Sequence, residues 1–461
     1  MMNRSDTIVA AATANGGALS LIRISGPEAI NIAARVFRPA GKKNIPETKG
    51  FSIIYGDILD ESGGFIDDVL VSVFRSPASY TGEDMAEISC HGSSYIVRNI
   101  IELLIRYGAR AADPGEFTTR AFLAGKIDLS QAEAVADMIS SHDRTTHSMA
   151  VTQMRGGYST DLKHLRGDLL RIASLIELEL DFSEEDVEFA DRGEIVGLAK
   201  SINDKVSSLI DSFSLGNALK EGIGVAIVGS PNVGKSTLLN ALLNDDRAMV
   251  SDIAGTTRDI IEERINLDGV EYRFIDTAGI RESADELERM GMERTFRSLE
   301  KAAVVLCMFD GSSGITASEI EKDVKALHVK EAQKLCIVLN KCDAGNVDND
   351  AILSVAGYPV ISTSAKYGIN IQGITDYLGS LVDTDSVLRG DTVVSNARHY
   401  EALLRSRQSL EMLIAGIESG LSGDLVSQEI KEALYWLGTI TGEITTDEIL
   451  GEIFSKFCIG K

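Results

Sequence analysis

The sequence lacks any apolar run long enough to span a bilayer, and its N-terminus lacks a basic-then-apolar signal pattern. We therefore expect no membrane association and a cytoplasmic protein. Cysteines number only five, without the spacing of disulfides or zinc sites, and Cys307 and Cys336 fall in patterns of buried strands. Basic residues, 45 against 69 acidic ones, are too few to balance the charge, which is −24. This argues against binding nucleic acid through bulk electrostatics, so any RNA contact needs a local basic patch or a basic partner.

What the sequence does contain is organised around one stretch. Residues 222–228 are an apolar run typical of a buried parallel strand. The next residues, Gly229 to Ser236, fit the phosphate-loop pattern of two glycines, Lys and Ser/Thr. Lys235 would reach the β- and γ-phosphates, Ser236 would ligate magnesium, and a helix over 235–244 would add its dipole. A Gly-rich turn without a ligand gives the same local pattern, so the rest of the chain has to decide.

Two further motifs follow in the order found in GTPases. The segment 255–259, Gly-Thr-Thr-Arg-Asp, supplies a hydroxyl, Thr257, that can close over Mg²⁺ and the γ-phosphate. A strand predicted over 270–275 then leads into Asp276, which would hold the metal through water. Gly279 can donate a backbone N–H to the γ-phosphate.

The last two motifs concern the base. The segment 340–343, Asn-Lys-Cys-Asp, follows a strand predicted over 334–339. Asp343 can accept two hydrogen bonds from the N1–H and N2–H₂ edge of guanine, which adenine cannot offer. The segment 364–366, Ser-Ala-Lys, follows a strand predicted over 359–362 and can present an N–H to guanine O6. Motifs in this order at strand ends are specific, and they predict a GTP-binding domain.

Two positions depart from a simple GTPase. Ile280 stands where many small GTPases place a Gln that orients the attacking water. An apolar residue cannot do so, and the role is either lost or carried by another group, such as a carboxylate within 281–289. Any one of those carboxylates can equally be a solvated helix residue. Asn232 could coordinate a monovalent cation beside the phosphates, or it could simply form the turn after Pro231.

The segments on either side of the GTPase stretch differ in pattern. The first alternates strands and helices and predicts an α/β domain, with strands over 7–12, 18–24, 51–59, 65–74 and 84–90 and helices over 28–37 and 94–107. Long helical patterns follow, over 131–141, 145–181, 192–214, 395–418 and 425–439. The simplest interpretation is one helical domain in two segments with the GTPase inserted. The expected domains are 1–121, 122–221, 222–380 and 381–461.

Two stretches of the first domain, 80–92 and 114–126, hold more polar and Gly residues than packing requires. They form either turns with a solvated charged face or a ligand pocket, with Glu87 and His91 on one strand and its exit. At the far end, the apolar residues within 454–459 favour a docked tail over a frayed terminus.

From end to end the chain resembles the MnmE (TrmE) family of bacterial tRNA-modification GTPases. The resemblance rests on segments 6–10, 21–26, 81–84, 91–92, 114–117, 121–123, 131–134, 253–259 and 458–461. It implies a multidomain α/β plus α fold: an N-terminal α/β tetrahydrofolate-binding domain that dimerises, a discontinuous helical domain and an inserted Ras-like P-loop G domain. It implies that G domains meet face to face when GTP and potassium bind. It also implies a FAD-dependent MnmG-type partner and a joint reaction that adds an aminomethyl or carboxymethylaminomethyl group to C5 of the wobble uridine of certain tRNAs.

The resemblance also implies roles for residues. Potassium would be held by Asn232, Ser251, Ile253 and Thr256, and magnesium by Ser236 and Thr257. Glu288 would orient the attacking water. A 5-formyl- or methylene-tetrahydrofolate would contact Arg23, Glu87, Lys126 and Lys461, while the role of the terminal Cys458 stays open. The expected GTP-binding residues are Asn232, Val233, Gly234, Lys235, Ser236, Thr237, Ser251, Asp252, Ile253, Ala254, Gly255, Thr256, Thr257, Asp276, Thr277, Ala278, Gly279, Asn340, Lys341, Asp343, Ser364, Ala365 and Lys366.

Two alternative functions differ in class. A ribosome-assembly GTPase would usually attach a basic RNA-binding domain, which this acidic chain lacks. Whether the purified protein carries folate or ribosomal RNA discriminates the two. A GTP-timed scaffold, with no chemistry beyond hydrolysis, stays open because the modification chemistry can reside largely on the flavin partner.

Overall fold

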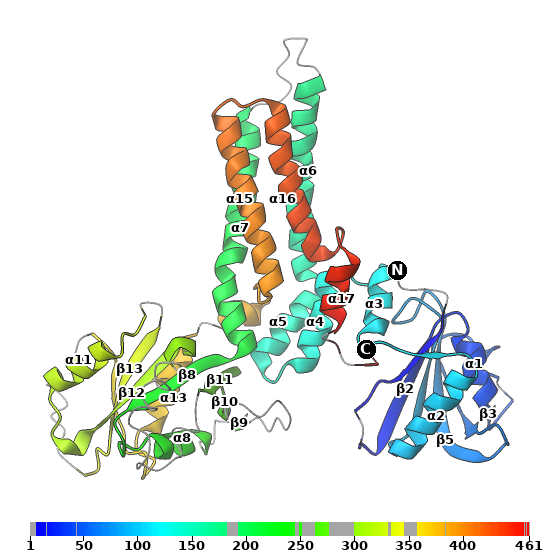
Figure 1. The fold of residues 1–461 in the computed structure, drawn as a ribbon, viewed down its shortest axis with the longest axis horizontal. Coiled ribbons are helices and arrows are strands. Elements are labelled where there is room, and N and C mark those ends of the chain that lie inside the picture. Colours follow the sequence, from blue (N-terminus) through cyan, green and yellow to red (C-terminus); the bar gives the residue numbers. More distant parts are fainter. Residues whose placement is uncertain are drawn as a thin grey trace. The chain divides into compact units, whose positions relative to one another are not determined.

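The computed structural model describes residues 6–14, 16–42, 44–181, 192–244, 249–250, 263–275, 299–330, 333–344, 357–382, 384–455, 457 and 459–460. The chain divides into two compact units, one made of 1–136, 153–198 and 412–461 and the other of 137–152 and 199–411. Figure 1 traces the elements of both. Within the described ranges, no helix is long and apolar enough to cross a membrane.

The first unit begins with a seven-stranded sheet in the order β3-β4-β5-β6-β2-β1-β7. Neighbouring strands are antiparallel except β1 and β7, which run parallel. The predicted strands are confirmed with small shifts at their ends, and the short edge strands β3 and β7 had not been predicted. The strands are β1 (Ile8–Ala11), β2 (Leu19–Ser25), β3 (Phe37–Pro39), β4 (Ser52–Leu59), β5 (Phe65–Phe74), β6 (Met85–His91) and β7 (Arg110–Ala111).

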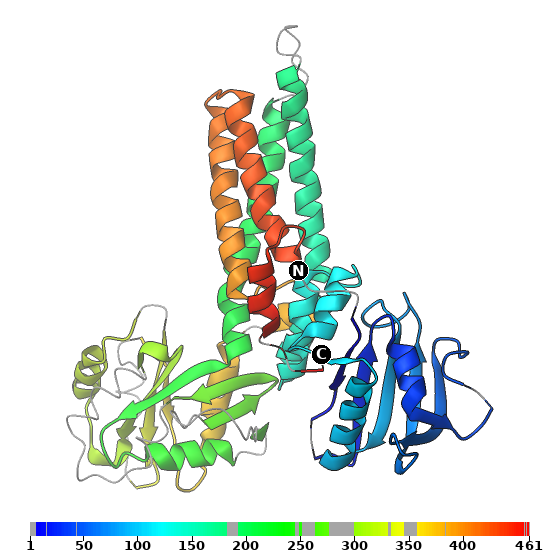
Figure 2. The ribbon, with the colours of Figure 1, turned by 45° about the vertical axis from the view of Figure 1, so that its right-hand side comes forward.

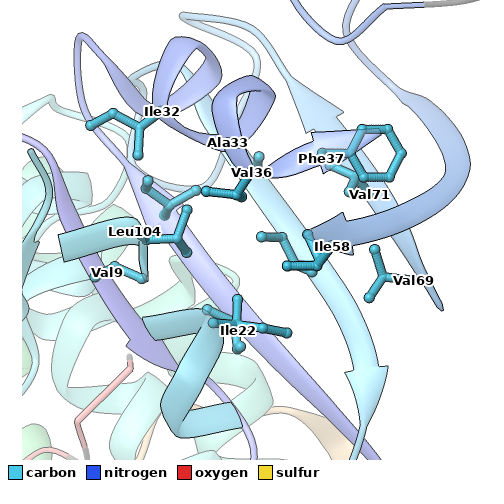
Figure 3. Close-up of a cluster of buried hydrophobic side chains, with 14 of the residues drawn as sticks. Val9, Ile22, Ile32, Ala33, Val36, Phe37, Ile58, Val69, Val71 and Leu104 are labelled. Atoms are coloured by element: carbon cyan, nitrogen blue, oxygen red, sulfur yellow. The ribbon is translucent and has the colours of Figure 1, made fainter. Parts of the chain in front are cut away.

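The core of this domain lies between the sheet and two helices. The helices α1 (Ala29–Val36) and α2 (Ser94–Arg106) cover one face of the sheet (Figure 1). Alternate residues of β5, among them Val69 and Val71, point into the same apolar cluster as Leu104 of α2 (Figure 3). This period-2 burial is what an antiparallel sheet with one covered face requires.

The polar stretch 114–126 is neither a bare turn nor a loop, because it folds into α3 (Glu116–Leu123). The C-terminal tail lies against it: α17 (Asp447–Ser455) brings Phe454 and Phe457 into a cluster with Leu129. A Cβ on Gly115 would lie 2.9 Å from the Phe454 carbonyl oxygen, so the tail packs closely on the start of α3. The docked tail is thus confirmed for both phenylalanines, whereas Ile459 is exposed.

The helical patterns are confirmed with one correction. The predicted helix over 145–181 is two helices, because Gly156 adopts φ +82° after the end of the first, a conformation that Gly accepts and that stops an α-helix. The pair α6 and α16 pack side by side (Figures 1 and 2). The helices are α4 (Leu129–Ser140), α5 (Arg144–Met154), α6 (Gly157–Asp181), α7 (Arg192–Glu221), α14 (Asp385–Arg389), α15 (Ala397–Glu418) and α16 (Gly423–Thr441).

The second unit contains the other seven-stranded sheet, in the order β14-β13-β12-β8-β11-β10-β9. Apolar clusters cover both of its faces, and Cys307 and Cys336 are buried in them as predicted. Pairing is parallel from β14 to β11 and antiparallel beyond it. The elements are β8 (Ile223–Gly229), α8 (Lys235–Leu243), β9 (Met249–Val250), β10 (Glu263–Leu267), β11 (Val270–Phe274), β12 (Val304–Asp310), η1 (Gly311–Ser313), α11 (Ala317–Ala326), β13 (Lys334–Asn340), β14 (Val360–Ser362) and α13 (Ile371–Ser380).

Candidate functional site

The phosphate loop joins β8 to α8 as predicted, and its backbone requires its small residues. Gly229 and Gly234 have φ of +151° and +101°. A Cβ on Gly229 would lie 2.3 Å from the Met308 carbonyl oxygen, and one on Gly234 would lie 2.3 Å from the Asn340 Nδ2. Asn232 also adopts a positive φ, +64°, which Asn tolerates better than most residues. The loop therefore curls as an anion-binding turn ahead of a helix N-terminus.

Lys235 lies over this loop. Its Nζ donates to the carbonyl oxygens of Gly229 and Ser230, at 2.8 and 2.9 Å. Burial lowers the pKa of Lys235. An ammonium held by carbonyl dipoles can exchange them for phosphate oxygens, which carry full charge. Ser236 and Thr237 follow in the first turn of α8, where a hydroxyl can reach a metal bound to those phosphates.

Asn340 ties two loops of the site together. Its side chain is buried, Nδ2 donates to the Val233 carbonyl at 2.7 Å, and Oδ1 accepts from the Ala365 N–H at 2.9 Å. The sequence predicted Asn340 as a nucleotide contact. The structure places it beneath the phosphate loop and the 364–366 segment, where it holds both in position.

Asp343 and Ser364 also meet, since the Ser364 hydroxyl donates to Asp343 Oδ1. Beside them, the Lys341 Nζ donates to Asp310 at 2.6 Å. Burial alone would raise the pKa of Asp310, but the hydrogen bonds from Lys341 and Ser312 outweigh it and lower that pKa. The Ser364 N–H donates to the Ile369 carbonyl and the Ala365 N–H to Asn340 Oδ1, so both of these N–H groups already have an acceptor.

The remaining predicted residues of this site lie outside the described residues. They are Ser251, Asp252, Ile253, Ala254, Gly255, Thr256, Thr257, Asp276, Thr277, Ala278, Gly279 and Glu288. The same holds for Ile280 and, in the tail, for Cys458 and Lys461.

A second candidate site lies on the N-terminal sheet. Arg23 of β2 stands directly opposite Glu87 of β6 in the antiparallel register. The Arg23 Nε and Nη2 both reach Glu87 Oε1, at 2.9 and 2.8 Å, and each side chain is 17% exposed. Both donors use the same oxygen, so Oε2 stays available to a ligand as far as the described residues go. A half-buried carboxylate beside a guanidinium can read a donor-rich heterocycle and hold an oxygen next to it.

The C-terminal tail reaches this pair. Arg23 Nη1 donates to the Gly460 carbonyl at 3.2 Å, across 437 residues of sequence. Gly460 has φ +95°, and a Cβ there would lie 2.1 Å from the Ala11 carbonyl oxygen. The tail therefore lies against β1 of its own chain. Lys126 is not brought to the pair in the same way, because its Nζ donates to the Pro77 carbonyl.

Two aromatic residues that the sequence analysis did not single out hold Arg23. Its guanidinium carbon lies 5.2 Å from the ring centre of Tyr80 and 5.5 Å from that of Phe117. The Tyr80 hydroxyl bonds to that of Thr118 at 2.8 Å. Tyr80 lies in the polar stretch 80–92 and Phe117 in the stretch 114–126. The composition therefore indicated the right stretches but not which of their residues contact Arg23.

A buried ion network supports α3. Arg120 is 5% exposed and pairs with Asp6, Glu83 and Glu116. Arg110 pairs with Glu116 as well, at 2.7 Å. Burial alone would raise the pKa of Glu116, but the hydrogen bonds from Arg110, the Asp113 N–H and Arg120 outweigh it and lower that pKa. Sequence reasoning missed this network because an isolated Arg on a helix is usually solvated.

His91 ends β6, as expected. Its Nδ1 lies 2.8 Å from Asp67 Oδ1, and its backbone N–H donates to Asp67 Oδ2. The hydrogen bond to Asp67 raises the pKa of His91. Asp67, Asp68 and His91 place ligand atoms within 4.8 Å of one another, but both oxygens of Asp67 are already engaged by His91.

Comparison with known proteins covers the whole chain. A family model described as the MnmE helical domain matches residues 129–458, and one described as the GTP-binding protein TrmE N-terminus matches residues 7–126. The chain is 50% identical over 472 residues to the tRNA modification GTPase MnmE of Flavobacterium johnsoniae, covering 100% of both chains. It is 48% identical over 464 residues to that of Bacteroides fragilis and 49% identical over 465 residues to that of Bacteroides thetaiotaomicron, covering 99% of each chain.

Proposed function

The chain belongs to the MnmE (TrmE) family of tRNA modification GTPases, and from this premise we propose a specific activity. It is a potassium-activated GTPase that works with a FAD-dependent MnmG-type protein. Together they add an aminomethyl or carboxymethylaminomethyl group to C5 of the wobble uridine of certain tRNAs. A tRNA substrate also implies a cytoplasmic protein.

One observation carries the nucleotide assignment. The buried Asn340 side chain joins the phosphate loop to the segment 364–366, and Asp343 lies on the same loop as Asn340. This sets a carboxylate for the guanine edge at a fixed place relative to the phosphate cradle. GTP is accordingly the proposed substrate. Magnesium would be held by Ser236 and Thr257, and supplies charge neutralisation at the phosphates when bound.

The potassium site rests on Asn232, which is exposed in the phosphate loop with its backbone in the left-handed region. An amide oxygen is a suitable ligand for a monovalent cation, and Ser251, Ile253 and Thr256 would complete the site. Turnover in KCl should exceed turnover in NaCl at equal ionic strength by about tenfold or more, with nucleotide affinity little changed. Equal rates in the two salts would remove the cation from the proposal.

The folate proposal rests on the second site. Glu87 can accept from a pterin, and Arg23 can bind its oxygens or the carboxylates of its glutamate tail. The contact between Arg23 and the Gly460 carbonyl supports a contribution from the next residue, Lys461, which would add a cation. Lys126 would supply a further cation. The ligand is a 5-formyl- or methylene-tetrahydrofolate, which supplies the one-carbon unit when bound.

A homodimer is proposed from the outer face of the N-terminal sheet. Tyr55 and Leu70 are directly opposed on β4 and β5 and are 53% and 45% exposed. Ile53 and Leu19 are 66% and 68% exposed. The alternation that buries one face leaves these apolar residues on the other, and such a patch marks an interaction surface. A second copy of the same sheet would cover it.

The test of the joint reaction is mass analysis of tRNA wobble uridines in cells that lack this protein. Loss of the C5 group, restored by the wild-type gene, is the expected result. Unchanged uridines would favour a scaffold or a ribosome-assembly GTPase. In the latter case ribosomal RNA and no folate should accompany the purified protein.

A further inference from the structure

Helix α5 is one of several long helices that the division into two compact units cuts, as it also does α4, α7 and α15. Residues 137–152 form one compact unit with the GTPase region, whereas the chain from Gln153 onward belongs to the unit that carries Arg23 and Glu87. The sequence analysis had placed the whole of 122–221 in one helical domain. A helix whose two ends lie in different units is positioned to relay movement between them.

The first end of α5 contacts the turn between β10 and β11. The Thr145 N–H donates to the Gly269 carbonyl at 3.3 Å. A Cβ on Gly269 would lie 3.4 Å from the Arg144 Cβ and 3.5 Å from the Thr145 Oγ1. About one helical turn further on, Met149 packs against the apolar core of the GTPase sheet, and the Ser148 hydroxyl reaches the Val387 carbonyl at 3.4 Å.

The other end of α5 is fastened separately. The Gln153 side chain donates to the Ser130 carbonyl at 2.8 Å, and the Gln131 side chain donates to the Met154 carbonyl at 3.0 Å. Both bonds join residues of the unit made of 1–136, 153–198 and 412–461. Each end of the helix is therefore held by its own set of hydrogen bonds.

The turn that meets α5 is stiff. β10 and β11 pair from Glu263–Phe274 to Leu267–Val270, which leaves Asp268 and Gly269 as a two-residue loop with φ of +51° and +86°. The Asn266 side chain accepts from the Gly269 N–H at 3.0 Å. Such a hairpin moves as one piece. Its open end is joined in sequence to the motifs 255–259 and 276–279, which are expected to bind magnesium and the γ-phosphate.

The junction also holds an unsatisfied polar atom. Thr145 is 1% exposed, and its hydroxyl has no hydrogen-bond partner among the described residues. A buried hydroxyl without a partner is unfavourable. Any other position of the hairpin that gives this hydroxyl a hydrogen-bond partner therefore competes with the observed arrangement. A two-state junction requires two such competing arrangements.

We propose that Gly269, Arg144 and Thr145 form the junction through which the nucleotide state of the GTPase region is transmitted, along α5, to the unit that carries out tRNA modification. They are positioning residues, since none of them is expected to touch GTP or folate. The inference rests on the proposed γ-phosphate contacts of the flanking motifs, and its tests include readouts that do not depend on tRNA modification.

The first test uses the full-length wild-type protein. Hydrogen–deuterium exchange of residues 144–152 is compared with GDP and with GDP plus aluminium fluoride in KCl. Exchange should differ between the two states by about fivefold or more, the usual lower range of coupling between sites. Identical exchange in the two states, with bound nucleotide verified, would overturn the proposal even if the protein modifies tRNA normally.

The second test changes the junction. In Gly269→Asn the left-handed turn is tolerated, and a side chain is added at a position whose Cβ would already contact Arg144 and Thr145 of α5. The matched control is Gly314→Asn, which has φ +71° and no atom within 4 Å of the added Cβ. We expect GTP hydrolysis within about twofold of wild type in both variants. Only Gly269→Asn should lose the nucleotide-dependent exchange of α5 and lower tRNA modification by about fivefold or more.

A third variant, Thr145→Val, tests the proposal even if Gly269→Asn fails to fold. Thr145→Val keeps the shape and the backbone N–H while removing the unsatisfied hydroxyl. It should stay folded and shift the exchange of α5 in both nucleotide states towards slower values, because the observed junction becomes more stable. Unaltered exchange in Thr145→Val, or full coupling and modification in Gly269→Asn, would contradict the proposal.

Discussion

The two sheets assemble their sites in different ways. In the GTPase region the described candidate residues lie at the ends of parallel strands: the phosphate loop follows β8, Asn340 ends β13, and Ser364 comes shortly after β14. In the N-terminal domain the candidates lie on the faces of antiparallel strands, with Arg23 opposite Glu87. The tail that completes this site comes from the far end of the chain.

The difference has a topological cause. Parallel strands point the same way, so the loops after them gather at one edge, and each contributes a short contiguous motif. Antiparallel strands build a site through register, so two residues 64 positions apart meet without any local pattern that marks them. Sites of the first kind can be found as motifs in a sequence, and sites of the second kind need the fold.

The largest effect should separate the two sites functionally. Glu87→Ala removes the carboxylate proposed to accept from the pterin. We expect loss of 5-formyltetrahydrofolate binding by calorimetry and loss of tRNA modification, with GTP hydrolysis kept. The matched control is Asp57→Ala, which breaks another cross-strand pair of the same sheet, with Arg38 at 2.6 Å, away from the tail. Normal tRNA modification by Glu87→Ala would show that Glu87 belongs to a solvated charged face and not to a ligand pocket.

The ion network should make the N-terminal domain sensitive to acid. Glu116→Gln removes a buried charge that pairs with Arg110 and with the buried Arg120, but Arg120 keeps Asp6 and Glu83. The substitution should therefore cost about 1–3 kcal/mol at pH 7. Glu61→Gln is the control, because its pair with Arg106 is exposed and worth less than about 1 kcal/mol. Urea unfolding followed by circular dichroism measures both.

The sign of the pH dependence follows from the lowered pKa of Glu116. The folded state holds this carboxylate ionised below its ordinary value of 4.5, so its contribution is present above that pH and is lost as the pH falls through the folded-state value. Glu116→Gln should unfold with a weaker dependence on pH below about 4.5. The same acid dependence in wild type and Glu116→Gln would show that other groups dominate.

Glu288→Ala tests the motif-built site. As a water-positioning group, Glu288 should matter for hydrolysis and not for affinity, so the rate should fall by roughly 100-fold while GTP binding is retained. Stopped-flow binding and phosphate release distinguish the two quantities. If Glu282→Ala or Glu286→Ala causes that loss instead, with Glu288→Ala near wild type, another carboxylate has the role.

The smallest effect concerns the base. Asp343→Asn removes an acceptor and adds a donor towards the guanine edge, so GTP affinity should fall by about tenfold or more. Preference should shift towards xanthosine triphosphate, whose C2 oxygen can accept from the new amide. Unchanged binding of GTP in this variant would show that the base is recognised elsewhere.

Much of the fold could be predicted because the local patterns agree with the tertiary structure. Strand β5 was predicted over its full observed extent, since the alternation along Phe65–Phe74 matches its burial. The predicted helix over 145–181 was wrong because a single Gly156 outweighs the surrounding helical pattern. Three of the predicted GTPase motifs, 229–236, 340–343 and 364–366, lie among the described residues. Each is at or just after the end of a strand, as predicted. The Asn340 side chain, however, holds two loops together through hydrogen bonds, and its position in the sequence does not reveal this role.

By itself the sequence determined the order of the GTPase motifs, the acceptor proposed for guanine and the family, because each of these depends on residues that are neighbours in the chain. Only the tertiary structure decided that Arg23 pairs with Glu87 between Tyr80 and Phe117, that Gly460 reaches the same pair, and that α5 packs with the GTPase sheet. These contacts join segments far apart in sequence. Their existence depends on strand register and on which surfaces bury one another, and a local pattern of residues carries neither.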